Sequence, residues 1–171
     1  MCKEEIWDIL DEDGNITGKT MVSGDKLAWQ AGIYHQGADV WIINSENKIL
    51  IQKRAPEKKL EPNVWAMTGG SVIKGESSLE TLKREVKEEL GIELKIDSAI
   101  KIKHYKTGNV WLDEYLVKQD IDLSKIVMQK EEVSDVKFVS FDEIEKLYQD
   151  NRFMKNRWEF VRDEIKKYIE K

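Results

Sequence analysis

The chain has 171 residues, of which 40% are hydrophobic and 36% are charged, proportions typical of one folded domain rather than a disordered chain. Its formal net charge of -5 argues against binding to the phosphates of a nucleic acid polymer, although an anionic small molecule held through a metal ion is not excluded. No apolar run is long enough to cross a membrane, so we expect no membrane contact.

The N-terminus and the cysteine content indicate the compartment. Cys2 is the only cysteine, so no disulfide can form within the chain and a reducing environment is favoured. The charged residues from Met1 to Glu5 lead to no signal-peptide core. We therefore expect a cytoplasmic location and, because chain termini are commonly loosely ordered, no catalytic role for Cys2.

Runs of β-branched and aromatic residues bounded by turn residues predict a series of strands. The first two form an N-terminal hairpin, because Asp11–Gly14 supplies aspartates and a glycine for the turn. The second pair turns at Ser45–Asn47, and Leu60–Trp65 is an irregular connection. The predicted strands or β-rich segments are Glu4–Leu10, Ile16–Val22, Gly37–Asn44, Lys48–Arg54, Ala66–Val72, Ile92–Tyr105, Val110–Lys118 and Val136–Ser140.

Helical patterns occur at Ser78–Leu90, at Phe141–Gln149 after a Ser140 or Asp142 cap, and at Asn151–Ile169. The last segment has an apolar stripe that is either core or a homodimer contact. The stripe comprises Phe153, Trp158, Phe160, Val161, Ile165 and Ile169. With no linker or repeat visible, residues 1–171 are predicted to form a single α/β domain in which helices enclose a mixed sheet.

The segment Ser78–Leu90 has strong helix boundaries. Ser77 and Glu80 have the spacing of a capping box, and Gly91 stands where a helix commonly ends. At about 100° per residue, one face of this helix is apolar, and we expect it to face the core. This face comprises Leu79, Leu82, Val86 and Leu90.

Three carboxylates share the adjacent face of the same helix. Glu85, Glu88 and Glu89 follow the i, i+3, i+4 spacing, so they lie on neighbouring turns and repel one another. A hard divalent cation such as Mg²⁺ or Mn²⁺ would relieve that repulsion and takes oxygen ligands. The alternative is a solvated, charged helix surface, which is the commoner origin of such a pattern.

The residues around the carboxylates favour a functional site. Gly69 and Gly70 end a strand and allow the backbone to approach a ligand closely. Arg84 and Glu76 have the charges for an ion pair that would brace the preceding loop against the helix. The run that begins at Gly70, continues through Glu76 and ends with REVKEELGI at residues 84–92 resembles the box of the Nudix hydrolase family at every fixed position.

The resemblance implies an α/β/α sandwich and a Mg²⁺-dependent enzyme that hydrolyses a diphosphate linkage in a nucleoside diphosphate derivative. It implies metal binding by Glu85, Glu88, Glu89 and the carbonyl of Gly69, with one carboxylate taking a proton from the attacking water. We predict that Arg84 is a catalytic residue together with the three glutamates, and that Glu76 is its structural partner. The metal lowers the pKa of bound water and neutralises charge on the diphosphate.

The family often adds one acid from outside the box. Glu132 is our first candidate for this further metal ligand, and the alternatives are Glu131, Asp113 and Glu114. Each of them is otherwise a solvated surface acid.

Substrate contacts are predicted at Arg54, Trp65 and Gly70, where a cation, an aromatic face and a close backbone approach would meet phosphate and base. Lys53, Lys58 and Lys59 are further cations, with a plain charged loop as the alternative. Trp41 and Trp111 are further aromatic surfaces for which core packing is the alternative.

The segments before the box are similar to Nudix proteins related to isopentenyl-diphosphate isomerase, which gives an alternative function. That isomerase needs a Cys just before the box and histidine ligands, whereas Trp65–Gly70 contains neither residue type. His35 is a single histidine without a partner for a metal site, so we expect it in the core or at its rim. A catalytically silent domain that senses a nucleotide is a third possibility, and the leaving group of the substrate stays open.

Overall fold

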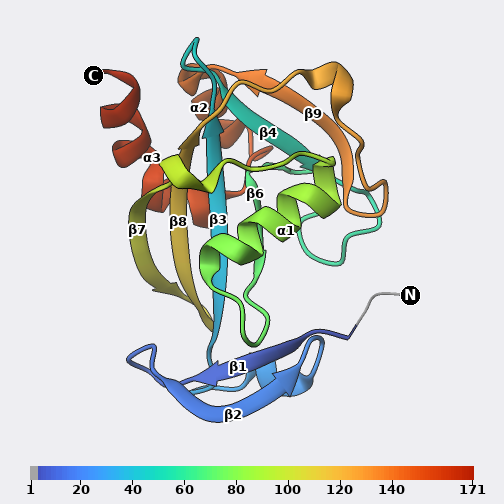
Figure 1. Cartoon of the computed structure of the whole chain (residues 1–171), viewed down its shortest axis with the longest axis vertical. Coiled ribbons are helices and arrows are strands. Elements are labelled where there is room, and N and C mark those ends of the chain that lie inside the picture. Colours follow the sequence, from blue (N-terminus) through green and yellow to red (C-terminus); the bar gives the residue numbers. More distant parts are fainter. Residues whose placement is uncertain (1–3) are drawn as a thin grey trace.

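A computed structural model of the chain describes residues 4–171 (Figure 1). The prediction about Cys2 lies outside the described residues. None of the helices in residues 4–171 is long and apolar enough to cross a membrane.

The strands and helices follow one another in the order shown by the sequence pattern. The strands are β1 (Ile6–Leu10), β2 (Ile16–Val22), β3 (His35–Ile43), β4 (Ile49–Arg54), β5 (Trp65–Ala66), β6 (Thr68–Ser71), β7 (Ile100–Thr107), β8 (Val110–Lys118) and β9 (Val133–Val139). The α-helices are α1 (Ser78–Leu90), α2 (Phe141–Gln149) and α3 (Lys155–Ile169), and short 3-10 turns occur at Lys26–Trp29, Ile96–Ser98 and Leu123–Lys125.

Seven of these strands form one mixed sheet. Its main path runs β5-β4-β3-β8-β7, while β6 pairs with β3 and β9 pairs with β4. β3 and β8 are parallel, whereas β4, β6, β7 and β9 join their neighbours antiparallel. The predicted mixed sheet is therefore confirmed, and β3 is the strand that meets β6, which leads into α1.

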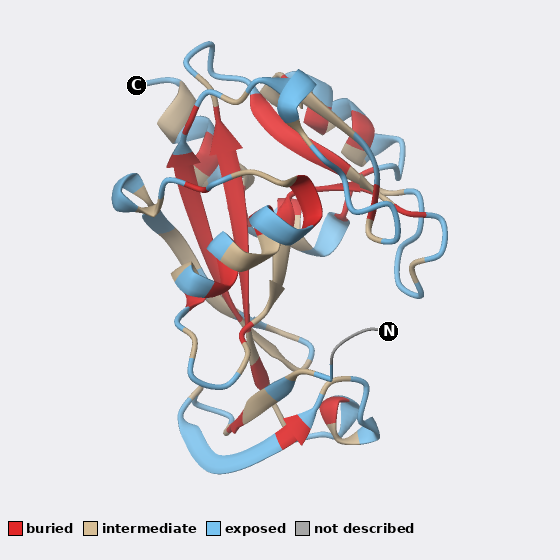
Figure 2. Ribbon diagram, turned by 45° about the vertical axis from the view of Figure 1, so that its right-hand side comes forward, coloured by how far each residue is buried: buried red, intermediate tan, exposed pale blue. Residues whose placement is uncertain are grey.

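The sheet is covered by helices on both faces (Figures 1 and 2). Successive residues of β3 point to opposite faces, so Trp41 packs with α2 and α3 while Val40 packs with α1. Leu82, Val86 and Leu90 of α1 are fully buried, which confirms the predicted core face. The chain thus forms the α/β/α sandwich expected from the sequence.

Four segment boundaries differ from the sequence prediction. The β-rich segment 92–105 is a strand only from Ile100, because a 3-10 turn at Ile96–Ser98 precedes it. The predicted strand 66–72 is split into β5 and β6, and β9 begins at Val133 rather than at residue 136. α3 begins at Lys155 because residues 152 and 154 are hydrogen-bonded to the backbone of Trp65, which holds the preceding segment extended.

The apolar stripe of the C-terminal segment is largely core. Trp158, Val161 and Ile165 are fully buried under the sheet, and Phe153 packs with them. Phe160 is the most exposed of these and stacks on Tyr105 of β7 at 4.3 Å between ring centroids. A homodimer contact therefore stays a prediction for Phe160 and the helix surface around it.

The N-terminal hairpin of β1 and β2 lies across one end of the sandwich (Figure 1). Leu10 exchanges two backbone hydrogen bonds with Tyr34, just before β3. Ile9, Met21 and Ala28 form a small apolar cluster beneath the hairpin. The hairpin is thus fixed to the loop ends of the sheet, close to the start of α1.

Candidate active site

Helix α1 has the bounds and caps that its sequence predicts. Ser77 and Glu80 form both hydrogen bonds of a capping box, and Gly91 ends the helix in the left-handed conformation with φ 70°. These local interactions fix the register of the helix. They therefore determine which face carries the three glutamates.

Arg84 is the centre of a cluster of carboxylates at this face. Its Nε lies 3.0 Å from Oε1 of Glu76, so the predicted brace between loop and helix is present. Its Nη1 lies 2.7 Å from Glu85, 3.4 Å from Glu88 and 3.9 Å from Glu5. The guanidinium thus partly neutralises four acids, although only 20% of its side chain is exposed.

Gly70 makes room for Glu85. A Cβ added at Gly70 would lie 2.4 Å from Cδ and Oε1 of Glu85, so any side chain at residue 70 would displace this carboxylate. Burial raises the pKa of Glu85 to about 7, although Arg84 opposes the rise; the charges of Glu5 and Glu88 add to it. The ionised form therefore lacks full compensation in the protein alone.

Gly69 faces the opposite side of the sheet and contacts Asp39 of β3. A Cβ at Gly69 would lie 1.8 Å from Oδ1 of Asp39 and 2.6 Å from the carbonyl of Ala38. Arg157 of α3 donates from Nε to the other oxygen of Asp39 at 2.8 Å. The backbone that carries the predicted carbonyl ligand is therefore in contact with a part-buried ion pair.

Glu89 is held by a polar chain from the sheet. Gln52 of β4 donates to Glu89 at 2.6 Å and accepts from the hydroxyl of Thr68 at 2.8 Å. Burial raises the pKa of Glu89 to about 8; the hydrogen bond from Gln52 opposes the rise, and the charge of Glu85 adds to it. Gln52 and Thr68 were not predicted from the sequence, because only the strand pairing brings them beneath α1.

The donor set at this end of α1 fits a hard divalent cation. Glu89 is buried and only 13% of the Glu85 side chain is exposed, so the charged forms of both carboxylates are destabilised. Glu88 is a third, more exposed oxygen donor on the same face. Within residues 4–171, however, no three acidic, histidine or cysteine side chains converge in a ready-made metal site. Arg84 and Gln52 occupy carboxylate oxygens that a metal would take, so metal binding stays a prediction.

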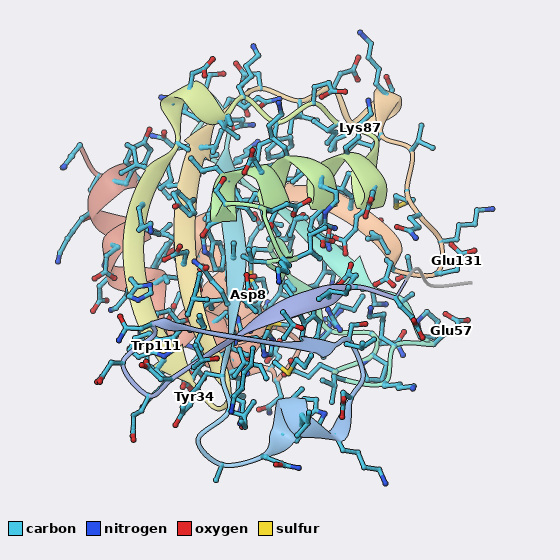
Figure 3. The ribbon with its side chains drawn as sticks, turned by 60° about the horizontal axis from the view of Figure 1, so that its bottom comes forward. Asp8, Tyr34, Glu57, Lys87, Trp111 and Glu131 are labelled. Carbon is cyan, nitrogen blue, oxygen red and sulfur yellow. The ribbon has the colours of Figure 1, made fainter. Side chains whose placement is uncertain are left out.

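The candidate acids outside the box lie in different surroundings. Glu132 is half-buried and paired with Lys58, close enough to Glu89 to affect its charge, whereas Glu131 is exposed and projects outward (Figure 3). Asp113 is buried and accepts hydrogen bonds from Ser78 and Gln36 near the first turn of α1. Of these three, only Glu132 lies beside the box glutamates, and its role as a ligand stays a prediction.

Glu114, the remaining candidate acid, lies on the other face of the sheet. It is fully buried and accepts from Trp41 at 2.8 Å and from Tyr105 at 2.9 Å. Burial raises its pKa to about 8, and the charge of Asp39 adds to the rise. Glu114 therefore belongs with the Asp39–Arg157 ion pair beneath α3, and the structure does not bring it to the glutamates of α1.

The predicted substrate contacts are scattered around this site. Arg54 ends β4 and donates from Nε and Nη2 to the carbonyl of Leu60, which orders the loop that follows. Trp65 is 4% exposed and lies in the core, with the ammonium of Lys137 4.5 Å from its ring centroid. Base stacking on Trp65 would need this cover to move, so its substrate role stays a prediction.

The other aromatic and basic candidates have structural contacts. Trp41 is fully buried, which confirms core packing for it. Trp111 stacks on His104 at 5.1 Å between ring centroids. Lys58 pairs with Glu132, and Lys59 is exposed.

His35 is buried at the rim of the sandwich, as expected. Its ring stacks on Trp7 of the hairpin at 4.4 Å, and its Nδ1 has no hydrogen-bond partner among residues 4–171. Burial lowers its pKa to about 4, so it is neutral at physiological pH. It therefore serves as an apolar contact between the hairpin and β3.

The model of the NUDIX domain family matches residues 33–163 of this chain. This chain belongs to the Nudix family. An uncharacterized Nudix hydrolase of Listeria monocytogenes is 38% identical over 151 residues and aligns over 88% of each chain. The crystal structure of DR0079 from Deinococcus radiodurans covers 87% of this Nudix chain and 91% of its own, with a TM-score of 0.73 at 20% identity.

A weaker similarity bears on the alternative function. The isopentenyl-diphosphate delta-isomerase of Aspergillus fumigatus is 26% identical over 181 aligned positions, which cover 85% of this Nudix chain and 63% of that enzyme. The family assignment itself supports a hydrolase that acts on pyrophosphate bonds.

Proposed function

We propose that this Nudix protein is a Mg²⁺-dependent hydrolase that cuts a diphosphate linkage in a nucleoside diphosphate derivative. The observation that carries the proposal is a pair of carboxylates with little exposure, the buried Glu89 and the 13% exposed Glu85, on the face of α1 that meets Gly70 and Gln52. Burial disfavours their charged forms, and a divalent cation would offset that cost. Because the intact box supplies every acid, a silent nucleotide sensor is the less supported alternative.

The residues of the site have two proposed roles, metal binding and positioning of the metal-binding carboxylates. Glu85, Glu88, Glu89 and the carbonyl of Gly69 would hold the metal, which when bound lowers the pKa of water and neutralises charge on the diphosphate. Arg84 fixes Glu85 from one side, and Gln52 fixes Glu89 from the other. Rigid placement of acids in this way limits the reorganisation that the reaction requires.

The substrate class is tested with a panel of oxidised nucleoside triphosphates, nucleotide sugars, ADP-ribose and dinucleoside polyphosphates. Each is incubated with the protein and Mg²⁺ in ¹⁸O-labelled water, and the products are analysed by mass spectrometry. We expect one class to yield a phosphate product that carries the label, because hydrolysis delivers water to phosphorus. If no member of the panel is cut at millimolar Mg²⁺, the proposal is wrong.

Dependence on the glutamates is tested with Glu88→Gln. This change removes one negative charge from the exposed part of the cluster and should lower turnover by about a hundredfold or more while the fold is retained. Glu93→Gln is the matched control, because Glu93 lies just beyond the same helix and, within residues 4–171, its carboxylate forms a single ion pair, with Lys87. Equal turnover in the two variants would exclude the metal-binding role of Glu88.

The isomerase alternative makes a different prediction. Isomerisation moves a proton on carbon and leaves the diphosphate intact, so isopentenyl diphosphate would take up deuterium from heavy water. We expect no uptake, since residues 65–70 lack the Cys that this chemistry needs. If isopentenyl diphosphate takes up deuterium and no nucleotide yields labelled phosphate, the isomerase function would be correct and the proposed hydrolase function would be wrong.

A further inference from the structure

The N-terminal hairpin extends the carboxylate cluster of α1. The family match begins at residue 33, so β1 and the residue before it lie outside the matched region. Glu5 nevertheless places Oε1 3.9 Å from Nη1 of Arg84. Its charge is also close enough to Glu85 to add to the rise in that pKa, which burial dominates. A residue outside the box thus lies within the charge network of the box.

Several contacts fix Glu5 at this point. The backbone N–H of Lys74, in the loop before α1, donates to the carbonyl of Ile6 at 2.7 Å. The indole of Trp7 donates to Oε2 of Glu5 at 3.2 Å, and the same ring stacks on His35. Figure 3 shows β1, with Asp8 labelled, crossing in front of the sheet toward α1. The hairpin is therefore tied both to β3 and to the loop that carries the brace.

The contacts of Arg84 indicate that Glu5 can act as an alternative acceptor for its guanidinium. The Nη1 of Arg84 is shared among Glu85, Glu88 and Glu5, and Glu85 is its nearest acceptor at 2.7 Å. Glu85 and Glu88 are the carboxylates proposed to take the metal. Glu76 keeps Nε and Nη2 of Arg84 paired, so a guanidinium that gives up Glu85 and Glu88 loses the acceptors of Nη1 alone. That part-buried donor needs another acceptor, because a buried donor left unsatisfied is costly. Glu5 is the acid in position to replace them.

We propose that Glu5 is a positioning residue that accepts Arg84 when Glu85 and Glu88 bind the divalent cation. The inference rests on the proposed function and adds the N-terminal hairpin to the active site. Glu5 itself is assigned no contact with metal or substrate. Its effect is on the affinity for the metal, which is independent of the identity of the substrate.

The test measures Mn²⁺ binding to the substrate-free protein by electron paramagnetic resonance of the unbound ion. Glu5→Gln is expected to weaken Mn²⁺ binding about three- to tenfold, since Arg84 would keep competing for Glu85 and Glu88. Glu4→Gln is the matched control. It removes the same charge one residue away, and Glu4 is exposed and has no side-chain partner within residues 4–171. We expect the control to bind within twofold of the unmodified protein.

The variant Glu5→Asp distinguishes the direct contact with Arg84 from the general electrostatic effect of a negative charge at residue 5. It keeps the negative charge but withdraws the carboxylate by one methylene, so it should bind Mn²⁺ as weakly as Glu5→Gln if the contact with Arg84 matters. Wild-type affinity in Glu5→Asp would mean that only the general field acts, and it would overturn the positioning role. Equal affinity of Glu5→Gln and Glu4→Gln would also overturn it.

Failure of the role proposed for Glu5 can be distinguished from failure of the proposed hydrolase function. If the unmodified protein binds no Mn²⁺ and cuts no nucleotide, the proposed function fails first. If it does both and the Glu5 variants match the control, only the role of Glu5 fails. A thermal melt of each variant is recorded without metal, because a loss of Mn²⁺ affinity with an unchanged Tm cannot come from a damaged hairpin.

Discussion

Replacement of Gly70 by alanine tests the geometry of the site with the smallest possible change. The φ angle of Gly70 is not in the left-handed region, so alanine is compatible with the backbone. Its Cβ would lie 2.4 Å from Cδ of Glu85, whereas ordinary contacts begin at 3.4 Å, so the carboxylate must move by about 1 Å. A displacement of that size costs about a hundredfold in rate when the displaced group acts in the reaction.

The fold should tolerate the same substitution. The atoms in conflict belong to the end of one side chain, and alanine also restricts the unfolded chain, so the net change in unfolding free energy should be about 1 kcal/mol or less. Gly37→Ala is the matched control, because its Cβ would press on Leu112 and Val110 at 3.0 Å, would lie in ordinary contact with the carbonyl of Gly70 at 3.6 Å, and has no glutamate among its three nearest atoms. It should lower the Tm and leave kcat/KM nearly unchanged.

The assay is kcat/KM on the substrate found in the nucleotide panel, with Tm measured by circular dichroism on the same samples. We expect Gly70→Ala to lose about two orders of magnitude in kcat/KM at nearly constant Tm. A kcat/KM within threefold of wild type would refute the reasoning, because it would show that Glu85 need not occupy its present position.

Three further substitutions test the supports of the site. Arg84→Ala leaves Glu76 without its partner and should lower both activity and Tm, the latter by about 5 °C; an unchanged Tm would exclude the brace. Gln52→Leu removes the 2.6 Å hydrogen bond to Glu89 and should lower kcat/KM about tenfold or more; wild-type kinetics would show that Glu89 needs no such support. Burial raises the pKa of Glu114 to about 8, so the folded state keeps a proton that the unfolded chain loses from about pH 4.5. Stability should therefore fall between about pH 5 and 8, and Glu114→Gln should flatten that part of a Tm–pH profile; an equally steep decline in the variant would contradict this.

The sequence predicted α1 well because its signals are local. The capping box, Gly91 and the apolar face all lie within one helix length, and the structure reproduces its bounds at Ser78 and Leu90. The predicted start of α3, at Asn151, was wrong because a tertiary interaction determines where the helix begins. Pairing of residues 152–154 with Trp65 holds that stretch extended, although its composition suits a helix.

The supports of the site were missed for the same reason. Gln52 is an ordinary polar residue in a strand, and only the strand order places it opposite Glu89. Asp39 and Arg157 are 118 positions apart, and no spacing rule connects them. The helical period places the three glutamates on one face, and the adjacent glycines, Arg84, Glu76 and the family resemblance identified that face as a site.

The two adjacent glycines show how the layers of the sandwich act on one site. Gly70 faces α1 and admits Glu85, while Gly69 faces the opposite layer and abuts Asp39, which Arg157 of α3 holds. Neighbouring strand residues point to opposite faces, so a single strand end can be supported from both. The predicted carbonyl ligand at Gly69 is thus positioned by the C-terminal helix, whereas the proposed carboxylate ligands belong to the box helix. It follows that α3, which contributes no box residue, helps to hold the proposed carbonyl ligand in place relative to the proposed carboxylate ligands of α1.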